Sequence, residues 1–229
     1  MGKRMSGRMR ASRVWHGALF AVALAALVTQ TVLVVQGGTD VNAAEAEPAE
    51  LQERLVRLFS YFTIQSNILV LAASGLLAAD PKRDGRAWRV LRLDALLGIV
   101  ITGLVFALVL APLVHPVGVA WWVNAGLHYV SPVAFLLGWL LFGPRGQVDG
   151  GTAWLAFIWP VAWIGYTFWR GHETGWFPYP FLDATELGWP RAALNTAIVL
   201  GAALLLAALA QLVDRLLKPA SGPARRRVP

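Results

Sequence analysis

The sequence contains no cysteine and few charged residues. Without cysteine, the chain can have no disulfide, thiolate metal site, iron–sulfur cluster or cysteine nucleophile. Only 14% of the 229 residues are charged whereas 57% are hydrophobic, and the mean hydropathy is +0.55. A water-soluble domain of this size needs more polar surface, so the composition predicts an integral membrane protein.

Signatures of metal and nucleotide sites are also missing. The sequence has no glycine-rich phosphate loop, no metal-ligand spacing and no convincing internal repeat, so inverted-repeat transport has no support. A haem held by two histidines would need a second deep histidine beside His128, but His16, His115 and His172 lie at or beyond the expected interfaces. We therefore expect no metal and no cofactor.

Long apolar runs dominate what is present. A membrane-spanning helix needs about 20 mostly apolar residues. We predict an all-α bundle of six membrane-spanning helices between residues 14 and 217, with basic segments at 1–13 and 218–229. The six runs are Val14–Val35, Val56–Ala79, Leu91–Val114, Trp121–Phe142, Trp154–Trp169 and Ala192–Leu212, of which the fifth is the shortest.

The distribution of basic residues predicts that both termini lie in the cytoplasm. An excess of Lys and Arg marks cytoplasmic segments, and with the amino terminus inside only Arg54, Arg57, Arg170 and Arg191 fall outside. The net charge of +7 comes from residues beside helix ends, so we expect membrane lipids and no nucleic acid as partners. We expect a multi-pass protein of the cell's inner (plasma) membrane. We also expect the first apolar run to remain uncleaved, because it is longer than the apolar region of a signal peptide.

Two further segments have distinctive composition. Residues 37–53 are acidic and predict a flexible external loop, and residues 221–229 predict a disordered tail whose arginines face anionic headgroups. Most of the eleven tryptophans lie near expected membrane boundaries, as an aromatic belt does.

Polar residues form stripes on three of the expected helices. Those that contain Thr63, His128 and Asn195 all begin at the outer face, which places Thr63 about 9 Å and His128 about 10 Å from that face at 1.5 Å per residue. The helical spacing predicts a polar pocket that opens outward. Its candidate lining residues are Thr63, Ser66 and Asn67, then Asn124, His128 and Ser131, then Asn195.

Two prolines interrupt the expected helices near this level. Pro132 cannot donate a hydrogen bond to the carbonyl of His128, and Pro160 cannot donate to that of Ala156. We expect a kink beside each carbonyl, which membrane proteins tolerate where protein or water satisfies the freed group.

Most of these polar residues have an ordinary structural explanation. Ser, Thr and Asn in membrane helices usually pack helices together through hydrogen bonds. His128 differs, because an ionisable side chain inside a membrane is costly and marks a functional site by default. A histidine can also remove the proton of a hydroxyl nucleophile, here Thr63. The developing oxyanion would need donors, for which Asn67, Asn124 and Asn195 are candidates.

Three stretches carry a family resemblance, namely 61–67 (YFTIQSN), 128–132 (HYVSP) and 175–183 (GWFPYPFLD). They resemble those of bacterial six-span membrane proteins distantly similar to the androgen-induced and androgen-dependent family of eukaryotes. That family consists of transmembrane threonine hydrolases that cleave fatty-acid esters of hydroxy fatty acids. The resemblance implies Thr63 as the nucleophile and His128 as its partner.

The leading expectation is therefore a membrane-embedded esterase that takes a lipid ester from the outer leaflet. The stiff aromatic segment 172–189 is expected to cap the pocket, and Asp183 is a candidate for orienting His128. The competing expectation is a non-catalytic lipid-binding, transport or assembly protein whose polar stripes only pack helices. The sequence leaves the substrate's chains and the oligomeric state open.

Overall fold

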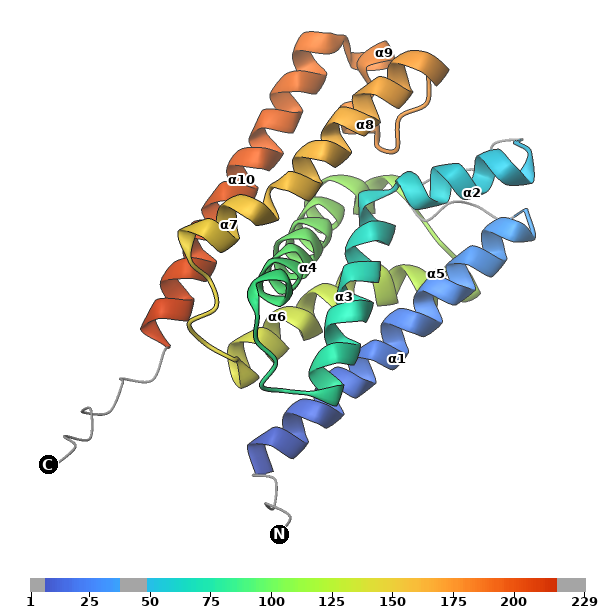
Figure 1. Cartoon of the computed structure of the whole chain (residues 1–229). Helices are drawn as coiled ribbons and strands as arrows, with labels where there is room; N and C mark the ends of the chain where they lie inside the picture. Colours follow the sequence, from blue (N-terminus) through green and yellow to red (C-terminus); the bar gives the residue numbers. More distant parts are fainter. Residues whose placement is uncertain (1–6, 38–48, 218–229) are drawn as a thin grey trace, which may run out of the picture.

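Helices form all the regular structure in the part of the chain that the computed structural model describes, residues 7–37 and 49–217 (Figure 1). Residues 1–6 of the basic leader, most of the acidic segment and the basic tail lie outside these residues, whereas residues 7–13 of the leader are helical and belong to the first helix. The elements are α1 (Gly7–Val35), α2 (Leu51–Ser60), α3 (Phe62–Ala79), α4 (Arg86–Val105), η1 (Phe106–Leu110), η2 (Ala111–Leu113), α5 (Val119–Ala125), η3 (Gly126–Val130), α6 (Ser131–Phe142), α7 (Gly150–Ala156), α8 (Ile158–Thr174), η4 (Pro180–Leu182), α9 (Ala184–Leu187) and α10 (Trp189–Leu216).

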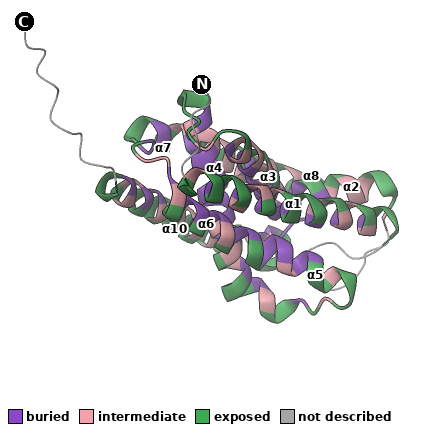
Figure 2. Cartoon of the chain, turned by 90° about the horizontal axis from the view of Figure 1, so that it is seen from below, coloured by how far each residue is buried: buried purple, intermediate pink, exposed green. Residues whose placement is uncertain are grey.

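The chain is a multi-pass membrane protein. Five helices of the described residues are long and apolar enough to cross a membrane, at 7–35, 62–79, 86–113, 119–142 and 189–216. Large apolar side chains cover the outer surface; Ile198 and Leu205 of α10, for example, are each 62% exposed. Figure 2 shows the buried residues gathered toward the interior, with exposed residues around them. Lipid is the solvent that such a surface matches.

The expected fifth span is present as two shorter helices. α7 ends at Ala156, and α8 begins at Ile158. The interruption lies at the carbonyl that Pro160 leaves without a donor, as expected. Figure 1 shows α7 and α8 following one another alongside α10. Neither is long enough alone to count among the five spans, so a sixth crossing stays a prediction.

The expected second span is also divided, which the sequence did not indicate. Tyr61 has extended backbone angles (φ −65°, ψ 128°) and separates α2 from α3. α2 therefore stands apart as a short amphipathic helix, and α3 begins at Phe62 rather than continuing from Val56. This break places Thr63 in the first turn of a helix.

The core joins α1, α3, α4 and α6, and the start of α1 lies at the same end of the bundle as the end of α10 (Figure 1). We call this the terminal end. Close approach of α3 and α4 depends on Gly98, because a Cβ there would lie 2.9 Å from Ser66 Oγ. Gly103 similarly admits Pro132, since its Cβ would lie 2.8 Å from the proline Cβ. Small residues at such crossings are typical of membrane helix packing.

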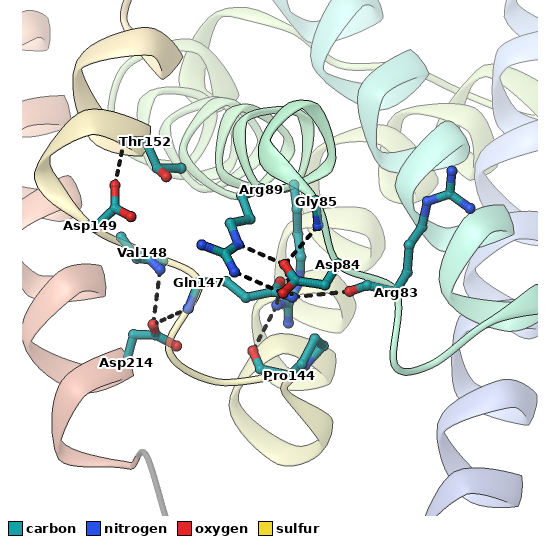
Figure 3. A network of polar contacts seen from close by, with 11 residues as sticks. Arg83, Asp84, Gly85, Arg89, Pro144, Gln147, Val148, Asp149, Thr152 and Asp214 are labelled. Carbon is teal, nitrogen blue, oxygen red and sulfur yellow. Dashed lines mark hydrogen bonds and ion pairs between the residues drawn. The ribbon is translucent and has the colours of Figure 1, made fainter.

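At the terminal end, a buried polar network fastens three segments together (Figure 3). Arg92 of α4 is 3% exposed and donates to the carbonyls of Gly143 and Pro144 and, at 3.0 Å, to Gln147 Oε1. The backbone amides of Gln147 and Val148 donate to Asp214 Oδ2 of α10, at 2.8 and 2.9 Å. The network therefore connects α4, the α6–α7 loop and α10.

A second, exposed pair lies beside that network. Arg89 forms two hydrogen bonds to the Asp84 carboxylate, at 2.6 and 2.7 Å, and Gln147 also donates to this carboxylate. The hydrogen bonds from Arg89 stabilise the ionised carboxylate and are the main reason why the pKa of Asp84 is lowered to about 2. Because solvent screens exposed pairs, we expect the pair to add little stability.

Candidate active site

Thr63 lies in the first turn of α3, where backbone amides have no carbonyl partner inside the helix. Its side chain is 3% exposed, and its hydroxyl lies 3.4 Å from His128 Nε2. The break at Tyr61 creates this position, because a helix running on from Val56 would have consumed the amide of Thr63. The amino-terminal end of a helix also carries partial positive charge, which favours a developing oxyanion.

His128 reaches Thr63 from η3, a π-helical turn between α5 and α6. π-Turns are frequent at functional sites, and this one precedes Pro132, where the sequence predicted a kink. The imidazole is 1% exposed and stacks on Phe106, with ring centroids 3.8 Å apart. Its Nδ1 lies 3.2 Å from the carbonyl of Asn124.

The contact with the Asn124 carbonyl determines which nitrogen of the His128 imidazole carries the proton. A carbonyl only accepts hydrogen bonds, so Nδ1 carries the proton and donates it, which leaves Nε2 with a free lone pair toward Thr63. This is the arrangement a general base needs to take the proton of a hydroxyl nucleophile. Oriented in this way, His128 can serve Thr63 without a carboxylate partner.

Tyr179 completes the cluster and comes from the segment between α8 and η4. Its hydroxyl lies 3.2 Å from Thr63 Oγ1 and accepts a hydrogen bond from the Thr63 amide at 3.1 Å. Burial raises the pKa of Tyr179 to about 12, so the phenol stays protonated at neutral pH. Tyr179 is therefore available as a hydrogen-bond donor directly beside the nucleophile.

The cluster faces an apolar pocket between α3, α4, α8 and α10. The pocket holds about 840 Å³ of empty space, part of it open to the surface. Thr63 and Tyr179 lie in its wall, whereas His128 is not among the lining residues and reaches the pocket only through Thr63. The expected polar pocket is thus mostly apolar; other lining side chains include those of Leu97, Ile101, Trp159, Trp163, Phe181 and Leu200.

Two of the remaining predicted residues donate to backbone carbonyls, and the others have buried polar atoms without a partner. Asn67 Nδ2 donates to the carbonyls of Thr63 and Leu127, so it packs α3 against η3, and Asn195 Nδ2 donates to the carbonyl of Phe181. Neither amide is free to serve as an oxyanion donor. Four side-chain oxygens of the predicted residues are buried without a hydrogen-bond partner, namely Ser66 Oγ, Asn67 Oδ1, Asn124 Oδ1 and Ser131 Oγ.

Asp183 does not have the orienting role that we considered from the sequence. Its Oδ1 accepts hydrogen bonds from the Thr185 amide and hydroxyl and from the Glu186 amide, which makes it the amino-terminal cap of α9. The carbonyl of Asn124 occupies the position at His128 Nδ1 that a carboxylate would take.

Two residues of the pocket wall were missed from the sequence. Tyr179 lies in the proline-flanked aromatic stretch, but its approach to Thr63 depends on how the 175–183 segment folds back. Asp94 is different, because an ionisable side chain inside a membrane is costly, and this applies to an aspartate inside the run Leu91–Val114 as it does to His128.

Among the described residues, no group of three His, Asp or Glu side chains is placed to hold a metal ion.

Known proteins provide no further guide. Comparisons with family models, with curated proteins and with solved structures give no match. Function is therefore inferred from the site itself.

Proposed function

We propose that this protein is a membrane-embedded hydrolase of lipid esters, with Thr63 as the nucleophile and His128 as the general base. The observation that carries the proposal is the contact between Thr63 Oγ1 and His128 Nε2 at the wall of an apolar pocket. The acyl chain of a fatty-acid ester fits such a lining, because it is itself apolar.

The chemistry follows from the three side chains. His128 Nε2 takes the Thr63 proton as Oγ1 attacks the ester carbonyl, and the protonated imidazole then gives that proton to the leaving alcohol. Water, deprotonated by His128, next attacks the acyl-threonine, which releases the carboxylic acid and restores the hydroxyl. In both steps Tyr179, whose hydroxyl oxygen accepts a hydrogen bond from the Thr63 amide, donates its own proton in a hydrogen bond to the oxyanion.

The orientation inferred from the basic residues indicates on which side of the membrane the site lies. With α7 and α8 together as the sixth crossing and the terminal end in the cytoplasm, Thr63 lies near the outer leaflet of the bacterial inner membrane. A lipid ester of that leaflet is then the substrate, and it reaches the pocket from within the bilayer.

The proposal is tested by hydrolysis of a long-chain fatty-acid ester of a hydroxy fatty acid by the purified protein. Thr63→Ala is expected to lower kcat by about 10³-fold or more, since no other hydroxyl replaces the nucleophile. Thr63→Ser, which keeps the hydroxyl, is the matched control and should retain measurable turnover. Equal rates for the parent and Thr63→Ala would refute the role of Thr63.

Replacing Tyr179 by Phe tests the oxyanion donor. Loss of one such donor typically lowers kcat by about 10²-fold, and KM should change little because the ring stays in the pocket wall. Tyr166→Phe is the control, since its hydroxyl contacts Ser60, not the cluster. A Tyr179→Phe variant with parental kcat would exclude the phenol from catalysis.

A non-catalytic lipid-binding, transport or assembly protein is the second candidate. It is favoured by the nearly all-apolar lining and by the exclusion of His128 from the pocket wall. Tight co-purification of a lipid with no turnover of any ester would support it.

A further inference from the structure

Asp94 is a carboxyl group in the wall of the apolar pocket, and the proposed reaction does not use it. It is 9% exposed, and its Oδ1 has no hydrogen-bond partner. No ion pair or hydrogen bond to Asp94 is found within residues 7–37 and 49–217. The nearest arginine along the chain, Arg92, is committed to the α6–α7 loop. A buried carboxyl without a partner is costly, and a polar group of a bound ligand would supply the missing partner.

The contact between α3 and α4 gives the depth of Asp94 below the nucleophile. Gly98 lies level with Ser66, because a Cβ there would be 2.9 Å from Ser66 Oγ. Thr63 is three residues from Ser66 toward the site, and Asp94 is four residues from Gly98 toward the terminal end. At 1.5 Å per residue, Asp94 lies about 10 Å from Thr63 along the helix axes.

Both groups line the same pocket, so one ligand can reach them together. Leu97, Gly98 and Ile101 line the wall between them on α4 and offer no side-chain polar atom. A ligand that spans the interval is therefore apolar in its middle and polar at two points. Thr102, whose buried Oγ1 also lacks a partner, follows Asp94 by eight residues and lies near the level of Thr63.

We propose that Asp94 binds a hydroxyl group of the ligand, which makes the substrate a lipid ester whose hydroxyl lies about 10 Å from the scissile carbonyl, measured along the helix axes. The position of the carbonyl rests on the proposed function. A carboxylate accepts hydrogen bonds, and a hydroxyl donates one. A hydroxyl also costs less to bring into an apolar pocket than a charged ammonium or carboxylate group.

The experiment measures binding in the Thr63→Ala background, where the ester is not consumed. Three matched long-chain esters are compared by calorimetry in lipid nanodiscs: one with a hydroxyl about 10 Å from the carbonyl in the extended chain, one with hydrogen there and one with an amine. The hydroxylated ester is expected to bind about tenfold more tightly than the plain one.

Two substitutions separate recognition from folding. Asp94→Leu should remove the preference for the hydroxylated ester and should strengthen binding of the plain ester. Asp94→Asn, which keeps an acceptor oxygen, should retain part of the preference. Equal binding of the two esters by the Asp94 protein, or an undiminished preference after Asp94→Leu, would overturn the proposal. Tighter binding of the amine would overturn the assignment to a hydroxyl.

Binding and turnover fail independently in this design. If the preference depends on Asp94 but the parent chain hydrolyses none of these esters, the ligand class stands and the proposed function fails. If the parent chain hydrolyses plain and hydroxylated esters equally well and binds them equally, the proposed function stands and the role of Asp94 fails.

Discussion

Replacing His128 by Ala is expected to lower kcat for ester hydrolysis by about 10³-fold while the protein stays folded. Without the imidazole, nothing among the groups in contact with Thr63 takes its proton, because the Tyr179 hydroxyl is itself protonated. KM should change little, since His128 is not in the pocket wall. The measurement is steady-state kinetics on a long-chain ester, with the folded fraction verified by size-exclusion chromatography.

His16 offers an unusually close control for this substitution. It is also 1% exposed, and its Nδ1 also contacts the carbonyl four residues earlier, that of Ser12, at 2.7 Å. It lies near the terminal end of α1, far from Thr63. His16→Ala therefore removes the same kind of buried imidazole, and we expect parental kcat. If both substitutions lowered kcat alike, the loss would reflect packing and not base catalysis.

Arg92 holds the buried polar network at the terminal end together, and its loss should destabilise the fold. Arg92→Met is expected to lower the free energy of unfolding by about 3–5 kcal/mol, because it leaves three acceptor groups of this network without their donor. The carbonyls of Gly143 and Pro144 and the Gln147 side chain would each lose a donor. Reversible unfolding in detergent, followed by circular dichroism, measures this change.

Arg89→Met is the matched control, one turn away on the same helix. The side chains of Arg89 and Asp84 are 31% and 50% exposed. Loss of this pair should therefore lower the free energy of unfolding by less than about 1 kcal/mol. Comparable losses for the two variants would mean that burial of Arg92 contributes nothing beyond an ordinary surface pair.

The sequence predicted the contact between Thr63 and His128 because two independent constraints converge on it. Ionisable and polar side chains are costly inside a membrane, and helices that start on the same side bring equivalent positions to the same depth. Both constraints depend only on composition and counting. The two residues are 65 positions apart in the chain and lie 3.4 Å apart at their polar atoms.

Tyr179 and the break at Tyr61 could not be predicted in the same way. The apolar run from Val56 to Ala79 contains no glycine near Tyr61 and no proline, so nothing local marks a helix boundary there. Tyr179 belongs to an irregular segment whose path is decided by packing, including the edge contact of its ring with that of Tyr61, 5.7 Å between centroids. Contacts of this kind follow from tertiary structure.

Two charged residues have contacts that the sequence did not indicate. Arg92 stands near a helix start and is one of the basic residues on the side expected to be cytoplasmic, and its buried side chain also binds the α6–α7 loop. Asp94, two residues later, was overlooked although the membrane cost of an ionisable group applied to it. A charge near a helix end can therefore serve orientation and packing together, and only the fold shows which atoms it meets.

Trapping the acyl-enzyme tests the central claim most directly. The purified protein is incubated with an activated long-chain ester and quenched with acid, and its peptides are analysed by mass spectrometry. The proposed mechanism predicts one acyl group on Thr63, absent from Thr63→Ala and formed more slowly in His128→Ala. Ester turnover without any acyl group on Thr63, or with acylation of another residue that is required for turnover, would contradict it.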